Sequence, residues 1–138
     1  MLFRSLRFIL SVVHSAAYHG LSYRRRKELH ARAGAVIEEL AGNDADSSAD
    51  VLSYHFSNSG DHGKAWKYSR TAAERAKKTY ANEQAVAHYQ AAIGAANNLP
   101  DLDRAEVVVQ ILKLGDILRI QGDSTTARNW YKIGRAHV

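Results

Sequence analysis

The chain has 138 residues, of which 46% are apolar and 24% charged, with a formal net charge of +5 at pH 7. These values are ordinary for one globular unit, and a single proline with many alanines favours helices over strands. The chain contains no cysteine, which excludes disulfides, thiolate metal sites and cysteine nucleophiles. Such a composition suits the cytoplasm, where we expect the protein to reside.

The first predicted helix covers the apolar start of the chain. Arg4 and Arg7 precede the apolar run Phe8–Val13, as basic residues precede the apolar core of a secretory signal. The run is short and is interrupted by Ser11 and His14, so a packed helix is favoured over a signal peptide. No segment approaches the roughly 20 apolar residues of a membrane span, and no membrane partner is expected.

The spacing of apolar residues predicts a helix from Tyr23 to Ala41. They form one stripe of an amphipathic helix, which consists of Leu29, Ala33, Val36, Ile37 and Leu40. Gly42 and Asn43 end it, and the polar stretch through Ser48 reads as a loop. Ser47 and Asp50 then resemble a capping box that opens a short helix, whose main side chains are Val51, Leu52, Tyr54, His55 and Phe56.

A pattern of Gly-Asp, an alanine five positions after the glycine and an aromatic residue three further on occurs twice in the chain. The copies are Gly60, Asp61, Ala65 and Tyr68, and Gly122, Asp123, Ala127 and Trp130; Asn82, Ala85, Tyr89 and Ala92 form a shorter relative. Glycine can end a helix in the left-handed conformation, aspartate can cap the next helix, and alanine allows two helices to approach closely. The pattern therefore predicts helix-turn-helix repeats, with Ala65 and Ala85 buried at helix crossings.

The same reasoning predicts the helices of the second half. One helix follows Asp61 to about Tyr80, with Ala65, Ser69, Ala72, Ala76 and Tyr80 on one face. The next runs from Asn82 to about Asn97 and buries Val86, Tyr89, Ile93 and Ala96. We expect these two helices to form one hairpin. After Leu99 and Pro100, Asp103 and Glu106 resemble a second capping box, for a helix that buries Val107, Ile111, Leu114 and Leu118.

The last two helices complete the prediction. Gly115 lies where a neighbouring helix would come close, Gly122 ends the helix that contains it, and a final helix begins after Asp123. The expected fold is all-α, with about seven helices in antiparallel hairpins stacked as an α-solenoid. The two Gly-Asp pairs are 62 positions apart, near two periods of about 34 residues, so the repeat is degenerate.

No chemical motif nominates a catalytic residue, a cofactor or a metal. The segment Gly60–Lys64 has the wrong spacing for a phosphate-binding loop, and Ala65 stands where a metal-holding hydroxyl is needed. None of the seven histidines is spaced three or four positions from another on a helix, so packed or surface imidazoles are favoured over a metal site. The sequence thus favours binding over catalysis.

The basic residues do not concentrate on one face, apart from the run Arg24–Lys27. Residues 1–32 carry a net charge of +6, residues 33–62 carry −6 and residues 63–138 carry +5. The run reads either as a solvated helix start that pairs with acids such as Glu28, or as a phosphate contact. A small basic helical domain that binds nucleic acid through Arg24–Lys27 and Arg32 is therefore the alternative function, although nucleic acid is the less expected partner.

These features resemble the tetratricopeptide repeat, on the residues Leu114, Gly115, Gly122, Ala127 and Tyr131. A longer set resembles the segment that follows the ATPase module in large bacterial signalling ATPases of the AAA/STAND type, which are joined to an adenylate or guanylate cyclase domain or to a LuxR-type DNA-binding domain. That set is Phe8, Ala17, Tyr18, Leu21, Arg24, Arg25, Arg26, Leu29, His30, Tyr54, His55, Gly60, Asp61, Ala65, Tyr68, Ala76, Tyr80, Ala81, Asn82, Ala85 and Tyr89.

The chain departs from that family at Ile9, Leu10 and Ser69, and it carries no cyclase or nucleotide-binding motif, so no enzymatic activity is transferred to it. The resemblance implies a helical segment at 1–45 that follows a missing ATPase module, and repeats at 46–132. Residues 133–138 match one reading frame of a common sequencing adapter, and they are a candidate adapter-derived tail whose removal after Lys132 would leave folding nearly intact; the chain would then be a fragment of a gene.

The resemblance implies an interaction or sensor module that binds a protein, a peptide or other domains of its parent chain. In such stacks the first helix of each hairpin lines a concave groove. The outward positions on these helices are the candidate partner-binding residues, against the simpler interpretation of plain solvent exposure: Lys67, Arg70, Glu74, Lys77, Leu112, Asp116 and Arg119.

Overall fold

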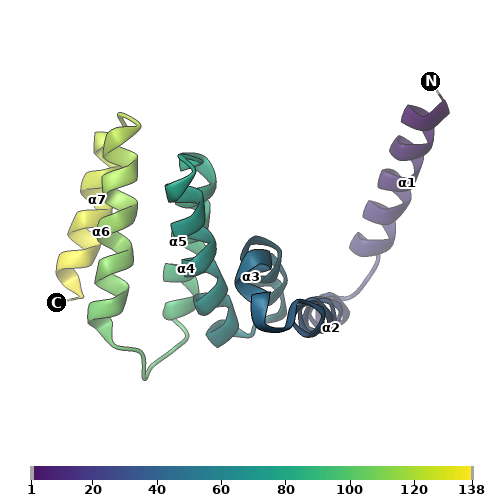
Figure 1. Cartoon of the computed structure of the whole chain (residues 1–138), viewed down its shortest axis with the longest axis horizontal. Helices are drawn as coiled ribbons and strands as arrows, with labels where there is room; N and C mark the ends of the chain where they lie inside the picture. Colours follow the sequence, from purple (N-terminus) through teal and green to yellow (C-terminus); the bar gives the residue numbers. More distant parts are fainter. Residues whose placement is uncertain (1, 138) are drawn as a thin grey trace.

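The computed structural model describes residues 2–137, and their fold is all-helical, with no strand among them. The elements are α1 (Leu2–His19), α2 (Tyr23–Ala41), the 3-10 segment η1 (Gly42–Ser48), α3 (Ala49–Ser59), α4 (His62–Lys78), α5 (Asn82–Ala96), α6 (Arg104–Ile120) and α7 (Ser124–Ala136). This confirms the predicted fold class. Helices α2 to α7 pack against one another, whereas α1 stands apart at one end of the row (Figure 1).

The six packed helices form antiparallel pairs that follow one another along the stack (Figure 1). Each of them packs on the next in the chain, and α4 with α5 forms the most extensive pair. The predicted hairpin between the helix after Asp61 and the helix from Asn82 is therefore confirmed. Helices α6 and α7 form the following hairpin, at the opposite end of the row from α1.

Both Gly-Asp pairs do what their residue types predict. Gly60 has φ +82° and Gly122 has φ +85°, which is the left-handed conformation that ends α3 and follows α6. The Oδ1 atom of Asp61 accepts the backbone N–H of Lys64 at 3.0 Å, and that of Asp123 accepts the N–H of Thr126 at 3.1 Å. Each aspartate thus caps the helix that follows it: Asp61 caps α4 and Asp123 caps α7.

Small residues occupy the close helix crossings, as predicted. Ala65 and Ala85 are fully buried. Gly115 lies directly beneath the ring of Tyr131 from α7, where a Cβ atom would overlap the ring. Because glycine and alanine leave room at these points, the larger side chains of Tyr68 and Tyr89 fill the space between the helices, and both are completely buried.

Ser69, which departs from the bulky residue usual in the resembling family, has a partner in the core. Its hydroxyl oxygen lies 2.7 Å from that of Ser53 on α3, and both residues are buried. Each hydroxyl can satisfy the other, so the small polar residue costs little in this position.

Three local predictions are wrong. The polar stretch predicted as a loop is the 3-10 segment η1. The hydroxyl of Ser47 donates to the backbone oxygen of Asp44 at 2.7 Å within it, and α3 begins at Ala49 without a side-chain cap, so the first capping box does not form. Tyr80 lies beyond the end of α4 with φ +58°, where the chain reverses, and its side chain is exposed rather than buried with the stripe of α4.

Asp103 does cap α6, because its Oδ1 atom accepts the N–H of Ala105 at 2.9 Å. The reciprocal half of the second capping box is missing. Glu106 instead accepts a hydrogen bond from Arg70 of α4 at 2.7 Å.

Helix α2 has the predicted bounds, but its apolar stripe is not its buried side. Leu29, Val36 and Leu40 are 47%, 53% and 82% exposed, and the buried residues are His30 and Gly34. The reason is the ring of Phe56 from α3, which sits 2.9 Å from where a Cβ atom of Gly34 would be. The close approach selects the glycine side of α2 for packing, so Leu29, Val36 and Leu40 of the stripe are exposed, whereas Ile37 of the stripe packs against the core.

Candidate partner-binding groove

A groove of about 280 Å³ lies between α4 and α6, the first helices of two consecutive hairpins. The backbones of these helices stay apart, and long side chains bridge the gap. The residues that line this α4–α6 groove are Arg70, Thr71 and Glu74 from α4 and Glu106, Val109, Gln110 and Lys113 from α6.

Two ion pairs connect the walls of the groove. The Nη1 atom of Arg70 lies 2.7 Å from the Oε2 atom of Glu106, and the Nζ atom of Lys113 lies 2.6 Å from the Oε1 atom of Glu74. These side chains are about one-third to one-half exposed, so each pair contributes little to stability, about 0–1 kcal/mol. Their value lies in placing two positive and two negative groups at fixed positions on the rim.

Glu74 is the most strongly held of these charges. Its Oε1 atom also accepts the hydroxyl proton of Tyr89 from α5, at 2.7 Å. Burial opposes the charge of this carboxylate, but the hydrogen bonds from Lys113 and Tyr89 outweigh burial and lower the pKa of Glu74. Burial and the contact with Glu74 in turn raise the pKa of Tyr89. Glu74 is therefore a carboxylate at neutral pH, and Tyr89 remains protonated.

Gln110 has an unsatisfied polar atom beside the groove. Its side chain is only 6% exposed, and its Oε1 atom is buried without a hydrogen-bond partner. A buried carbonyl oxygen without a donor costs free energy, of the order of 1–3 kcal/mol. A ligand that donates an N–H or O–H group into the groove would remove this penalty.

A similar arrangement lies between α2 and α4. There Glu38 accepts from the Nζ atom of Lys64 at 2.6 Å and from the hydroxyl of Tyr68 at 2.7 Å. The hydrogen bonds from Lys64 and Tyr68 lower the pKa of Glu38, and burial with the Glu38 contact raises the pKa of Tyr68 to about 12. Glu38 and Glu74 are 36 positions apart, so a carboxylate bonded to a lysine and a tyrosine recurs along the stack.

The structure places two of the seven candidate partner-binding residues in the groove, Arg70 and Glu74. The other candidates lie elsewhere on α4 and α6. Lys67 and Lys77 are exposed on α4, and Leu112 and Arg119 are exposed on α6. The carboxylate of Asp116, also on α6, accepts the hydroxyl of Tyr131 at 2.7 Å. A partner role for all seven remains a prediction.

Sequence reasoning missed the α6 side of the groove. Glu106, Gln110 and Lys113 follow one another at spacings of four and three, which places them on one helix face. This spacing is visible in the sequence. The face that it defines borders the buried apolar residues of α6, so Gln110 looks like one more core position and does not indicate a groove. The groove along this face of α6 becomes visible only when α4 is placed opposite α6 in the structure.

The basic run at the start of α2 is partly engaged within the chain. Arg24 pairs with Glu28 at 3.1 Å. Arg26 donates to the backbone oxygen of Leu21 at 3.2 Å and lies over the ring of Tyr18. Such internal contacts leave fewer of these bases free for phosphate groups.

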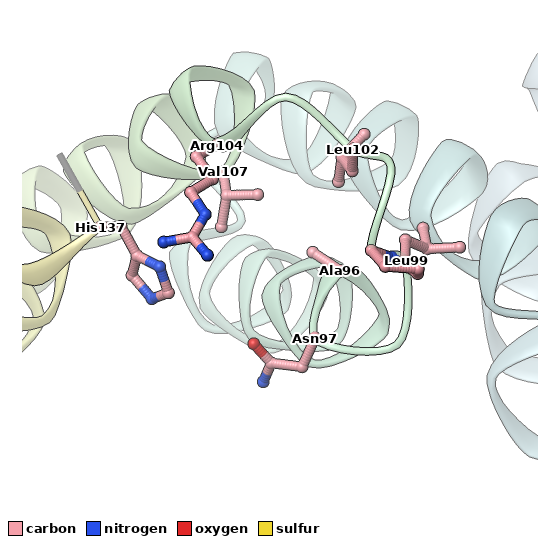
Figure 2. Close-up of a pocket in the computed structure, with 8 residues that line it drawn as sticks. Ala96, Asn97, Leu99, Leu102, Arg104, Val107 and His137 are labelled. Carbon is pink, nitrogen blue, oxygen red and sulfur yellow. The ribbon is translucent and has the colours of Figure 1, made fainter.

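A second, smaller pocket of about 200 Å³ lies near the loop between α5 and α6 (Figure 2). The polar side chains of Arg104, His137 and Asn97 gather on one side, and Leu99 and Leu102 lie on the other (Figure 2). Its polar wall depends on His137, which falls in the candidate adapter-derived tail. The α4–α6 groove, formed by two complete helices, is the better site.

Residues 2–137 contain neither a metal-binding cluster nor a membrane-crossing helix. No group of three or more histidines, aspartates or glutamates there is arranged to hold a metal ion. No helix in this range is both long and apolar enough to cross a membrane. The glycine-rich segment before Lys64 forms the turn into α4, and the Lys64 amine is bonded to Glu38.

Comparisons with protein-family models, with curated proteins and with solved structures found no match.

Proposed function

We propose that this chain is a tetratricopeptide-like interaction module that binds an extended peptide segment, of another protein or of its parent chain, in the α4–α6 groove. The observation that carries the proposal is the buried, unpartnered Oε1 atom of Gln110 at the groove. A peptide backbone offers N–H donors at regular intervals, and rotation of the Gln110 side chain toward the groove would pair this buried acceptor with one of them.

The charges on the groove rim support a peptide ligand. Arg70 and Lys113 can bind carboxylates or backbone oxygens, and Glu74 and Glu106 can bind amines or guanidinium groups. Each charged side chain has a partner across the groove. A ligand that replaces this partner keeps the charge paired, which costs less free energy than leaving the charge without a partner. The stacked hairpins supply a rigid support for these groups.

The all-helical stack also agrees with a sensor module of a larger bacterial signalling ATPase, linked to a cyclase or a transcription regulator. The resembling residues Gly60, Asp61, Ala65 and Tyr68 support this setting, since they form the turn and crossing that the repeat requires. We propose it as the context in which the groove would report a bound segment to other domains.

The test uses a phage-displayed library of random linear peptides as the probe. Binders are selected on the purified chain and then measured on the Gln110→Leu variant, which keeps the side-chain size and removes the acceptor. We expect affinity for selected peptides to fall at least about tenfold, the equivalent of one hydrogen bond to a buried group.

Gln90→Leu is the matched control, because Gln90 is an exposed glutamine on α5 that does not line the groove. Peptides that bind Gln110→Leu as well as the parent would overturn the proposal, and so would a selection that yields no binder. Binding that collapses as salt is raised and is unaffected by Gln110→Leu would favour the nucleic-acid alternative at Arg24–Lys27.

A further inference from the structure

Two apolar surfaces of the chain lie close in sequence and uncovered in the structure. Helix α1 carries Leu6, Ile9 and Val13 along one face, and each is more than half exposed. Helix α2 carries the exposed stripe that includes Leu29 and Val36. Most of the stability of a helix in a protein comes from packing of its apolar face, so α1 needs a surface on which to pack.

The linker between the two helices permits a hairpin. Only Gly20, Leu21 and Ser22 separate α1 from α2, and helical hairpins have connections of about two to five residues. The helices have 18 and 19 residues, so an antiparallel pair would match in length. In the structure α1 instead points away from α2, and only its last turn makes contact, through a 3.0 Å hydrogen bond from Tyr18 to His30 (Figure 1).

The two stripes are in register about the linker. Leu6 and Val36 each lie fifteen positions from Leu21, on opposite sides. Ile9 and Ala33 each lie twelve positions away, and Val13 and Leu29 eight. An antiparallel hairpin that turns at Leu21 therefore places these apolar residues opposite one another, with the bulky Ile9 over the small Ala33.

The basic and polar side chains of α1 would face solvent in that arrangement, together with the ring of Phe8, which is 71% exposed in the structure. Arg4, Arg7, Ser11 and His14 lie on the side of α1 away from Leu6, Ile9 and Val13, given about 100° per residue. We propose that α1 docks on the exposed stripe of α2 as an antiparallel hairpin, so that the chain covers the open end of its own stack. The partner of this surface is a segment of the same chain, and the inference does not depend on the α4–α6 groove.

The chain contains no cysteine, so a disulfide can report this contact without background. The double variant Ile9→Cys/Ala33→Cys is oxidised at low protein concentration and examined by non-reducing electrophoresis and peptide mapping. We expect a disulfide within one chain and the loss of both free thiols. In the matched control Ser11→Cys/Ala33→Cys the first cysteine lies on the polar face of α1, and we expect its thiols to stay free.

A disulfide that links two chains would overturn the proposal in favour of a second copy on the stripe, and thiols that stay free in Ile9→Cys/Ala33→Cys would overturn it outright. A second measurement avoids the double variant. Labelling of Val36→Cys by a maleimide should be slower than labelling of Ala31→Cys, an exposed position on the side of α2 away from the stripe, given about 100° per residue. Equal labelling rates in the two single variants would also contradict docking.

Discussion

Among the residues whose burial the structure describes, four polar residues are buried, and the serine pair, the histidine and the glutamine differ in how their polar atoms are bonded. Ser53 and Ser69 bond to each other. His30 bonds to Tyr18 through Nε2 and to His55 through Nδ1, both at 3.0 Å. Only Gln110 keeps an unpaired atom, which singles it out as the buried polar side chain that suits a ligand.

The serine pair gives a prediction at the scale of single residues. In Ser69→Ala the hydroxyl of Ser53 loses its buried partner, and we expect the free energy of unfolding to fall by about 1–3 kcal/mol. The double variant Ser53→Ala/Ser69→Ala leaves no unpaired hydroxyl, so it should be more stable than the sum of the single effects indicates. Urea unfolding of the four proteins measures this.

Ser57→Ala is the control for the serine pair, because Ser57 is an exposed serine on α3. It should unfold with the parent. Strictly additive effects of the two core substitutions would show that Ser53 and Ser69 do not depend on each other.

Single residues also mark the limit of what the sequence could predict. Gly60, Asp61, Gly122 and Asp123 were predictable because their roles are local, set by φ and by a side chain three residues from an N–H group. The role of Gly34 was not, since it depends on a ring of Phe56 that lies 22 positions away. The same holds for Gln110, whose unpaired oxygen is a property of its neighbours.

At the scale of elements, helix bounds were predicted better than helix faces. The predicted bounds of α2 agree with the structure because start and stop signals are local. Its buried side was predicted correctly at Ile37 and wrongly at Leu29, Val36 and Leu40, because an apolar stripe does not show which neighbouring helix is present. On α6 the candidates Leu112, Asp116 and Arg119 lie about 100° around the helix from the residues that line the groove.

The junction of α1, α2 and α3 contains two histidines, His30 and His55, from which we predict a pH-dependent stability. Burial and the neighbouring His55 lower the pKa of His30, and burial lowers the pKa of His55. Tyr18 of α1, Tyr54 of α3 and Arg26 of α2 are the other titratable groups of this cluster. The hydrogen bond between the two Nδ1 atoms needs one imidazole to donate and the other to accept. When both imidazoles are protonated, both Nδ1 atoms carry a hydrogen and the bond is lost.

Because the pKa of both histidines is lower in the folded state, the unfolded chain binds protons first as the pH falls. Their contribution to stability is therefore complete above the unfolded pKa of about 6.5 and is lost as the pH decreases below it. We expect the melting temperature to drop between about pH 7 and pH 5, and to drop less in His55→Gln. Thermal unfolding followed by circular dichroism at both pH values measures this.

His14→Gln, at an exposed position of α1, is the control and should keep the pH dependence of the parent. His88 also has a lowered pKa through burial, so a smaller dependence is expected to persist in His55→Gln. The junction would have no role in the pH response if the parent and His55→Gln lost the same number of degrees.

At the scale of the whole molecule, the stack explains why the repeat was visible and yet degenerate. The Gly-Asp pattern supplies a turn, a cap and a small residue at the crossing locally, once between α3 and α4 and once between α6 and α7. The groups that connect one hairpin to the next, such as Glu38 with Lys64 and Glu74 with Lys113, lie 26 and 39 positions apart. Since these spacings differ, no fixed period in the sequence could reveal them.

A stack of this kind transmits a change only between neighbouring helices, so its ends should be the most tolerant of deletion. Residues 133–136 form the end of α7, and Gly134, which has no side chain, is the buried residue among them, against Ile111 of α6. Ile133 is 42% exposed. Deleting residues 133–138 should therefore lower the free energy of unfolding by less than about 1 kcal/mol, as for surface changes.

Deleting residues 123–138 should lower the free energy of unfolding far more, because it removes all of α7 and uncovers the side of α6 that contains Ile111 and Gly115. Urea unfolding of both truncated chains beside the parent decides the matter. If the short deletion is as damaging as the long one, the last turn of α7 is essential to the stack and residues 133–138 act as a native part of the fold.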